Sequence, residues 1–294
     1  MKKFAAIQMT SGPEVAPNLA AAETLIAAAA VAGAGLVALP ENFALMARSD
    51  AERLSTAEDD GRGPIQDFLA ATARRHKLWL VGGTLPIKTT QPKKMRSACL
   101  LFDDRGRRVA RYDKMHLFDA HLPGRAPSGQ PSAAQFCSGQ NCDVEPPNGE
   151  QYRESAVFEP GSEVVVADTP FGKLGLAVCY DLRFPELFRA MLDRGAGVFA
   201  VPSAFTALTG RAHWEVLVRA RAIENLAWVI AAAQGGRHAN GRETHGHSMV
   251  VSPWGEVLAH QENGPGIALA MCDAVRQAQI RAQLPSLQHR KLNT

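Results

Sequence analysis

Cysteine, net charge and long apolar runs are all scarce in this chain of 294 residues. Its five cysteines form no disulfide-like pattern, so we expect a reducing compartment and a cytoplasmic protein. The chain has 32 basic and 29 acidic residues, which gives no electrostatic case for binding nucleic acid or a membrane surface. The apolar stretch at 25–39 is broken by Gly33 and Gly35, so it is not expected to span a bilayer. The first apolar run is too short for a signal peptide.

Apolar runs alternate with helical patterns, and no linker or repeat divides the chain, so we predict one mixed α/β domain over 1–294. Helices are predicted at 18–31, with Asn18 as the N-cap, at 64–76, from Pro185 onward, and at 212–225. Buried strands are predicted at 4–9, 36–39, 78–82, 97–102, 108–112, 163–168, 174–179, 198–202, 227–233, 248–252 and 256–259.

Two segments depart from this alternation. Residues 119–150 are rich in Pro, Gly, Ser and Asn and show no regular period, so we predict a long surface loop, either a lid or an insertion. Residues 274–294 form a C-terminal extension. Within the loop, Cys137 and Cys142 could form a metal or disulfide pair, but no second ligand pair has zinc-site spacing. The sequence therefore predicts no metal.

Polar residues of three chemical kinds follow predicted strands: Glu41, Lys114 and Cys179. Sites in open α/β sheets form at the carboxyl ends of strands, so these side chains could converge. A thiolate attacks acyl carbons, a carboxylate can accept the thiol proton, and an ammonium can stabilise the oxyanion that forms. The three residue types together indicate acyl transfer, whereas each one alone is more typical of a buried thiol or a solvated strand end.

Three segments strengthen this interpretation: LPENF at 39–43, YDKMHLF at 112–118 and GLAVCYDLRFPE at 175–186. In order and spacing they resemble the signature segments of the nitrilase (carbon–nitrogen hydrolase) superfamily. The resemblance extends from residue 4 to about residue 273 and departs mainly at 126–150.

The resemblance implies a four-layer α-β-β-α sandwich with a Glu-Lys-Cys triad. Glu41 would be the general base, Lys114 the oxyanion stabiliser and Cys179 the nucleophile that forms a thioester. The backbone N–H of Tyr180 would complete the oxyanion hole, and Glu154 matches a second glutamate that the family often places near the pocket. The resemblance implies no cofactor, a small-molecule amide substrate, and a homodimer or larger even homo-oligomer.

The segments around the nucleophile indicate a branch of the superfamily. True nitrilases typically follow the cysteine with Trp-Glu, whereas this chain has Tyr180-Asp181. The segments at 201–206, 209–215 and 219–225 resemble the Nit-type amidases. Among these, the chain most resembles the members that hydrolyse deaminated glutathione to 2-oxoglutarate and cysteinylglycine. The alternative within the same chemistry is ω-amidase action on 2-oxoglutaramate or 2-oxosuccinamate.

Further pocket residues follow from position. Ala204, Phe205 and Thr206 follow a predicted strand, where Phe205 would contact the acyl chain and Thr206 a polar substrate group. Arg183 could bind a substrate carboxylate or pair with an acid such as Asp181 or Glu186. In a different class of function, Cys179 would be the reactive thiol of a redox-sensing or non-catalytic binding protein. A redox sensor needs no general base, so the Glu41 and Lys114 segments argue against that alternative.

Overall fold

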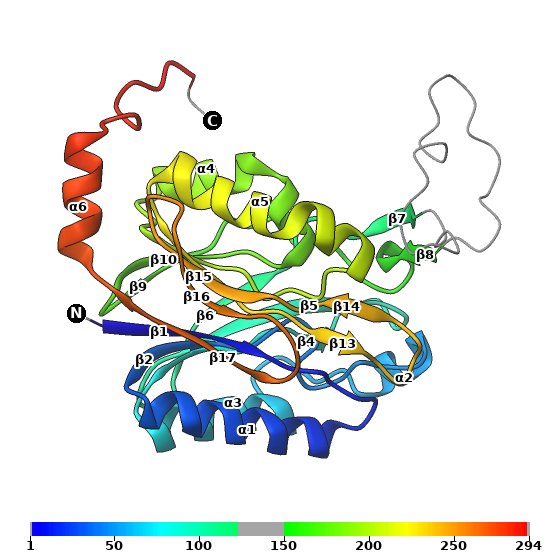
Figure 1. Cartoon of the computed structure of the whole chain (residues 1–294). Coiled ribbons are helices and arrows are strands. Elements are labelled where there is room, and N and C mark those ends of the chain that lie inside the picture. The colour runs from blue at the N-terminus through cyan, green and yellow to red at the C-terminus, as the bar shows by residue number, and fades with distance from the viewer. Residues whose placement is uncertain (1, 123–149, 293–294) are drawn as a thin grey trace, which may run out of the picture.

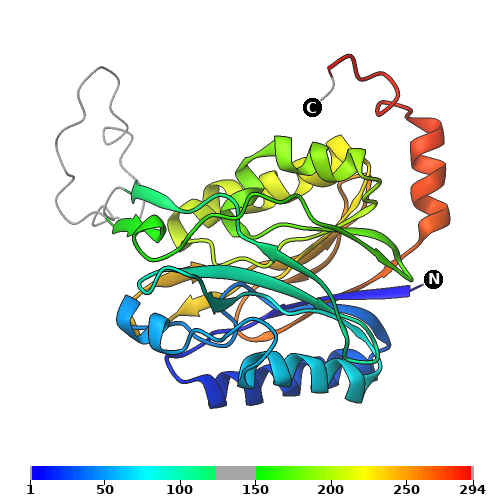
Figure 2. The ribbon, with the colours of Figure 1, turned by 180° about the vertical axis from the view of Figure 1, so that it is seen from behind.

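The computed structural model describes residues 2–122 and 150–292, in which two mixed β-sheets pack face to face between helices (Figure 1). This is the four-layer α-β-β-α arrangement that the resemblance implied. The outer face of the first sheet is covered by α1 (Val15–Val31) and α3 (Pro64–His76). The second sheet is covered by α4 (Pro185–Asp193) and α5 (Ala207–Asn225), as the opposite view in Figure 2 also shows.

The first sheet has the strand order β17-β1-β2-β3-β5-β4, and β6 pairs with β5. Strands β1, β2 and β3 are parallel, and the other pairs are antiparallel. The strand bounds are β1 Lys2–Gln8, β2 Ala34–Ala38, β3 Trp79–Val81, β4 Leu85–Lys88, β5 Met95–Phe102, β6 Arg108–Asp113 and β17 Gly266–Cys272.

The second sheet has the order β16-β15-β12-β11-β10-β9, with β10, β11 and β12 parallel. Its bounds are β9 Val166–Thr169, β10 Gly172–Leu176, β11 Val198–Ala200, β12 Trp228–Ala231, β15 Ser248–Val251 and β16 Val257–Gln261. The remaining elements are α2 Asp50–Ser55, the 3-10 turns η2 Glu154–Ala156 and η3 Cys179–Arg183, α6 Ala274–Gln283, and the hairpins β7 Asp119–Leu122 with β8 Glu150–Arg153 and β13 Gly235–Arg237 with β14 Glu243–His245.

Alternation along the strands explains the layers. In β1, Phe4 and Ala6 face the second sheet, whereas Ala5 and Ile7 pack against the helices of the first. Both faces of the central strands are buried, so they appear in the sequence as continuous apolar runs rather than alternating ones. Every predicted helix and strand overlaps an observed one, since length and apolar content were sufficient to locate them.

Two local predictions were wrong. Helix α1 begins at Val15, so Asn18 is a residue of its first turn rather than its N-cap. The Asn18 side-chain amide accepts from the Gly12 N–H and donates to the Ala44 carbonyl. Residues 119–122 and 150 belong to the hairpin β7–β8 rather than to a loop. The rest of the predicted lid or insertion, with Cys137 and Cys142, lies outside the described residues. The C-terminal extension begins with α6, which buries Ile280.

The link between β3 and β4 brings the chain against the segment that carries Glu41. Gly83 has a φ of +55°, and a Cβ at this position would lie 2.2 Å from the Pro40 carbonyl oxygen. A side chain is excluded here both by backbone conformation and by contact. The close approach allows the Thr84 hydroxyl to accept a hydrogen bond from the Asn42 N–H at 2.9 Å. Gly83 therefore helps to fix the turn at Glu41.

Substituting Gly83→Ala is expected to destabilise the protein more than Gly61→Ala. Gly61 also has a positive φ, +87°, but nothing lies within 4 Å of its Cβ position. Both variants carry the cost of a left-handed alanine, about 1–2 kcal/mol, and only Gly83→Ala adds overpacking of about 1–3 kcal/mol. Urea denaturation of both variants measures the difference. Equal losses of stability would show that the Pro40 contact does not constrain this turn.

Candidate active site

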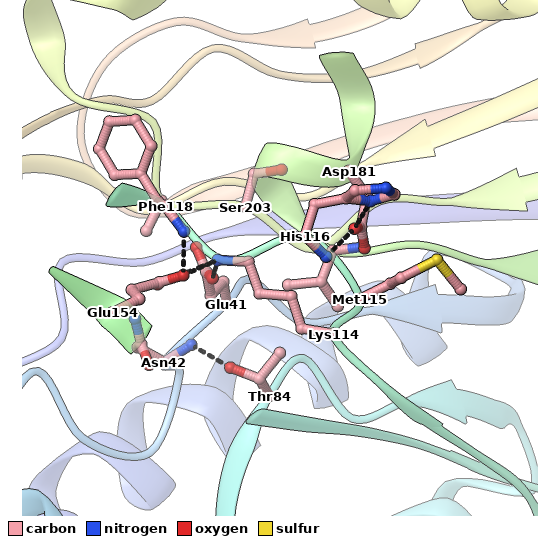
Figure 3. Close-up of polar contacts among 12 residues, drawn as sticks. Glu41, Asn42, Thr84, Lys114, Met115, His116, Phe118, Glu154, Asp181 and Ser203 are labelled. Atoms are coloured by element: carbon pink, nitrogen blue, oxygen red, sulfur yellow. Dashed lines mark hydrogen bonds and ion pairs between the residues drawn. The ribbon is translucent and has the colours of Figure 1, made fainter. Parts of the chain in front are cut away.

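The structure brings Glu41, Lys114 and Glu154 into direct contact. The Nζ of Lys114 lies 2.9 Å from Glu41 Oε1 and 2.8 Å from Glu154 Oε2, between the two carboxylates (Figure 3). The side chain of Lys114 is only 1% exposed and that of Glu41 only 3%. Breaking a buried ion pair by removing one partner leaves an uncompensated charge, so these groups depend on one another.

The carboxylate and the ammonium reach this point from two different strands of the first sheet, β2 and β6. Glu41 follows β2, and its carbonyl oxygen accepts a hydrogen bond from the Gln234 side chain at 3.1 Å. Lys114 follows β6, and its N–H continues the pairing with β5 by donating to the Ser97 carbonyl at 2.9 Å. Gly161 donates to the Lys114 carbonyl at 2.9 Å. Main-chain hydrogen bonds therefore fix both residues.

Cys179 comes from the second sheet, just beyond β10. The predicted strand 174–179 ends early, at Leu176, and Cys179 starts the turn η3 with a φ of +50°. Left-handed backbone is uncommon for a residue other than glycine and costs on the order of 1–3 kcal/mol. The Cys179 N–H donates to the Pro202 carbonyl at 2.9 Å. The sharp turn places the thiol beside the carboxylate of Glu41, with which it forms a hydrogen bond.

Charge and burial set the protonation states. Burial alone would raise the pKa of Glu41, but the adjacent Lys114 ammonium holds it below its ordinary value of 4.5. Burial would lower the pKa of Lys114, whereas the Glu154 and Glu41 carboxylates raise it above its ordinary 10.5. The pKa of Cys179 lies well above 9.0, because the thiol is buried and faces the Glu41 carboxylate. The resting site therefore combines an ionised Glu41 with a neutral thiol.

A buried carboxylate, Asp181, joins the lysine segment to the cysteine turn. Its oxygens accept hydrogen bonds from the Tyr112 hydroxyl at 2.7 Å, the Val178 N–H at 2.8 Å and the His116 N–H at 3.0 Å. The His116 ring also contacts it at 2.7 Å, as Figure 3 shows. From the sequence, Asp181 was expected only as a possible ion-pair partner of Arg183, and this network was not predicted. The signal for this network in the sequence was an acidic residue two positions after the cysteine that follows a predicted apolar strand.

Glu154 begins the turn η2, directly after β8. Besides contacting Lys114, its carboxylate accepts from the Phe118 N–H at 2.8 Å. The hairpin β7–β8 thus positions this second glutamate from the far side of the lysine. Its predicted location near the pocket agrees with this geometry.

The remaining predicted site residues surround a narrow pocket beside Cys179. This pocket has a volume of about 10 Å³, room for about one water molecule. Its walls include the predicted residues Tyr180, Arg183, Ala204, Phe205 and Thr206. Cys179 is 7% exposed as a residue and lies in the same wall, so the pocket reaches the residue.

The wall residues differ in their contacts. The Arg183 guanidinium lies over the Tyr180 and Phe205 rings, at 5.6 Å and 5.2 Å, and its Nη1 is 3.1 Å from the His213 ring. The backbone of Ala204 forms a hydrogen bond with the Cys179 sulfur that favours the thiolate. The Thr206 hydroxyl caps α5 by accepting from the Thr209 N–H. That capping role was not predicted.

Within residues 2–122 and 150–292, no three histidine, cysteine or acidic side chains are grouped so as to hold a metal ion. In the same ranges no helix has both the length and the apolar content needed to cross a bilayer. Of the three cysteines described, Cys99 and Cys272 are buried and free, like Cys179.

The lowered pKa of Glu41 predicts a loss of stability in acid. An acid with a depressed folded-state pKa contributes in full above its unfolded-state value, here 4.5, and the contribution is lost as the pH falls through the lower value. The wild type should exceed Glu41→Gln in unfolding free energy by up to about 3 kcal/mol near neutrality, since Glu154 still faces Lys114. Urea titrations should show this difference shrinking below about pH 4.5. A difference that grows on acidification would contradict an ionised Glu41.

Comparison with known proteins places this geometry in a family. The carbon-nitrogen hydrolase family matches residues 3–282. The deaminated glutathione amidase of Synechocystis sp. is 41% identical over 289 residues, 97% of each chain. The C. elegans NitFhit protein aligns with a TM-score of 0.83 and 35% identity over 99% of this chain, which spans 65% of the NitFhit chain.

A mutant of the amidase from Nesterenkonia sp. AN1, which shows the Michael addition of acrylamide at its active-site cysteine, aligns with a TM-score of 0.72. It is 25% identical, over 98% of this chain and 100% of that one. The family match and the Synechocystis relative both extend over nearly all of the sequence that builds the two sheets and the Glu41–Lys114–Cys179 cluster. The chain therefore belongs to the carbon-nitrogen hydrolase family of the nitrilase superfamily.

Proposed function

We propose that the protein is an amidase that hydrolyses deaminated glutathione to 2-oxoglutarate and cysteinylglycine through a thioester on Cys179. The observation that carries this proposal is the contact of Lys114 with Glu41 and Glu154 beside the thiol. The deaminated glutathione amidase of Synechocystis sp. supports the substrate, through its identity of 41% along nearly the whole chain.

In the acylation half, the Cys179 sulfur attacks the amide carbonyl carbon while the thiol proton passes to Glu41. The resting thiol has a raised pKa, so transfer to the hydrogen-bonded carboxylate occurs as the sulfur–carbon bond forms rather than beforehand. The oxyanion is stabilised by the Lys114 ammonium and the Tyr180 backbone N–H. Glu41 then returns the proton to the amide nitrogen, the carbon–nitrogen bond breaks and the amine leaves.

In the deacylation half, Glu41 takes a proton from a water molecule, whose oxygen attacks the thioester carbon. The carbon–sulfur bond breaks, the carboxylic acid forms, and the sulfur recovers its proton from Glu41. Glu154 keeps Lys114 in place and charged through both halves, because its carboxylate helps to raise the ammonium pKa. The two glutamates thus have separate tasks, one in proton transfer and one in positioning.

The acyl group of this substrate ends in a 2-oxo carboxylate, and Arg183 is one of the two cations in the wall of the Cys179 pocket, the other being Arg242. We assign Arg183 to that carboxylate and Phe205 to the methylene chain. The pocket of about 10 Å³ must widen as the acyl chain enters, and we expect a side-chain rotation of Arg183 to widen it. The Thr206 hydroxyl caps α5 and also contacts the Thr209 hydroxyl at 2.9 Å, and we assign it to a polar substrate group because it lines the same pocket.

We also propose a cytoplasmic location and a homodimer or larger even homo-oligomer. The free thiols of Cys99, Cys179 and Cys272 agree with a reducing compartment.

A panel of three amides tests the proposed substrate: deaminated glutathione, 2-oxoglutaramate and 2-oxosuccinamate. We expect kcat/KM to favour deaminated glutathione by about tenfold or more, equivalent to about 1.4 kcal/mol of transition-state binding. Cys179→Ala should abolish turnover, and Cys272→Ala, which removes another buried thiol, should retain it. A preference for the two primary amides would assign ω-amidase activity instead. No turnover of any amide would refute the proposal.

The substitution Lys114→Met removes the ammonium that would stabilise the oxyanion and keeps much of the apolar part of the lysine side chain. We expect kcat to fall by about a hundredfold or more, as for the loss of one oxyanion donor. The two carboxylates would also repel one another, so activity is measured at a temperature at which circular dichroism shows the variant folded. Activity near the wild-type level in the folded variant would contradict the role of Lys114.

A further inference from the structure

Two arginines near the site have buried nitrogen atoms with no partner. In the described part of the chain, three buried side-chain polar atoms lack a hydrogen bond, and two of them are Arg53 Nε and Arg242 Nε. Buried donors are nearly always satisfied in native proteins, and an unsatisfied one on a cation costs more than one on a neutral group. Both arginines line the same cavity, which has a volume of about 390 Å³. Their shared location indicates a site for an anion.

Aromatic rings hold the two guanidinium groups in place. The Arg53 group lies over the Phe158 ring at 5.6 Å, and the Arg242 group lies over the Tyr152 ring at 5.2 Å. One nitrogen of each is committed: Arg53 Nη1 donates to Asp50 at 2.8 Å, and Arg242 Nη2 donates to the Ala204 carbonyl at 2.5 Å. A guanidinium fixed at its face keeps its N–H edge for a planar, bidentate acceptor. A carboxylate has that shape.

The two charges are also close enough to act together. Burial lowers the pKa of Arg53, and the positive charge of Arg242 lowers it further, against the opposing effect of the Asp50 and Glu154 carboxylates. The carboxylates of this cavity already have cationic partners, since Asp50 contacts Arg53 and Glu154 contacts Lys114. An added anion would relieve the repulsion between the arginines.

The cavity adjoins the catalytic cluster. Glu154 lies in its wall, and Phe118 and Arg242 belong both to this cavity and to the narrow Cys179 pocket. The two spaces are therefore neighbours that share these two walls. The cavity of 390 Å³ is far larger than the pocket of 10 Å³, so it suits the bulkier product of the cleavage.

We propose that Arg53 and Arg242 bind the terminal carboxylate of a peptide leaving group, and that this contact selects peptide-linked amides over primary amides. The proposal rests on the proposed function, in which the leaving group is a dipeptide with a free carboxylate. A primary amide releases ammonia, which has no group to reach the arginines. Arg53 and Arg242 are thus specificity-determining residues, distinct from Arg183 on the acyl side.

This contact is tested by changing the enzyme and the substrate separately and together, and comparing the four values of kcat/KM. The substrates are deaminated glutathione and the same compound with its glycine carboxylate converted to a carboxamide. For the wild type we expect kcat/KM to fall by about tenfold or more when the carboxylate is removed, as for a lost charge-assisted bidentate contact. For Arg53→Gln this difference should be clearly smaller than in the wild type, because one of the two cationic partners of the carboxylate is gone.

Arg48→Gln is the matched control. Arg48 lies near Arg53 in sequence, its side chain is 57% exposed, and it pairs with Glu52 outside the cavity. This variant should keep the wild-type preference for the carboxylate. If Arg53→Gln does not fold, Arg242→Gln takes its place, and the wild-type comparison stands by itself.

The outcomes separate the two proposals. Equal rates of the wild type on the acid and the carboxamide overturn the carboxylate subsite while leaving the amidase proposal intact. An Arg53→Gln variant that loses activity equally on deaminated glutathione and 2-oxoglutaramate overturns the assignment to the leaving group, because 2-oxoglutaramate has only the acyl carboxylate. A wild type that hydrolyses neither compound rejects the proposed function itself.

Discussion

The buried ammonium of Lys114, held between the carboxylates of Glu41 and Glu154, is the interaction on which the rest of the site depends. Each charge alone would be costly to remove from water, and together they satisfy one another at 2.8–3.0 Å. The same ammonium keeps Glu41 ionised beside a neutral thiol. Ground-state stability and readiness for proton transfer therefore arise from a single arrangement of charges.

This arrangement requires the two sheets to pack in one register. Glu41 and Lys114 extend from the first sheet and Cys179 from the second, so the apolar layer between the sheets sets the distance from sulfur to carboxylate. Asp181 reinforces that register, because it binds the lysine segment through Tyr112 and the cysteine turn through Val178. The strained backbone of Cys179 is maintained by these surroundings.

The fold class and the residues that meet at the site could be predicted from the sequence, because short continuous segments indicate both. Apolar runs mark the buried strands, and Glu41, Lys114 and Cys179 stand at strand ends within recognisable segments. Features that depend on contacts distant in the sequence were missed. Asn18 resembles an N-cap in the sequence, but in the structure its amide donates to the Ala44 carbonyl. Arg53 and Arg242 are separated by 188 residues, and only the folded chain brings them to one cavity.

The most direct test of the central claim, that these charges convert Cys179 into an acyl-accepting nucleophile, is the mass of the enzyme during turnover. Deaminated glutathione is mixed with the wild type, quenched in acid within a single turnover and digested for mass spectrometry. We expect a 2-oxoglutaryl adduct on the peptide that contains Cys179 and none on those with Cys99 or Cys272. Release of cysteinylglycine without any adduct on Cys179 would contradict it.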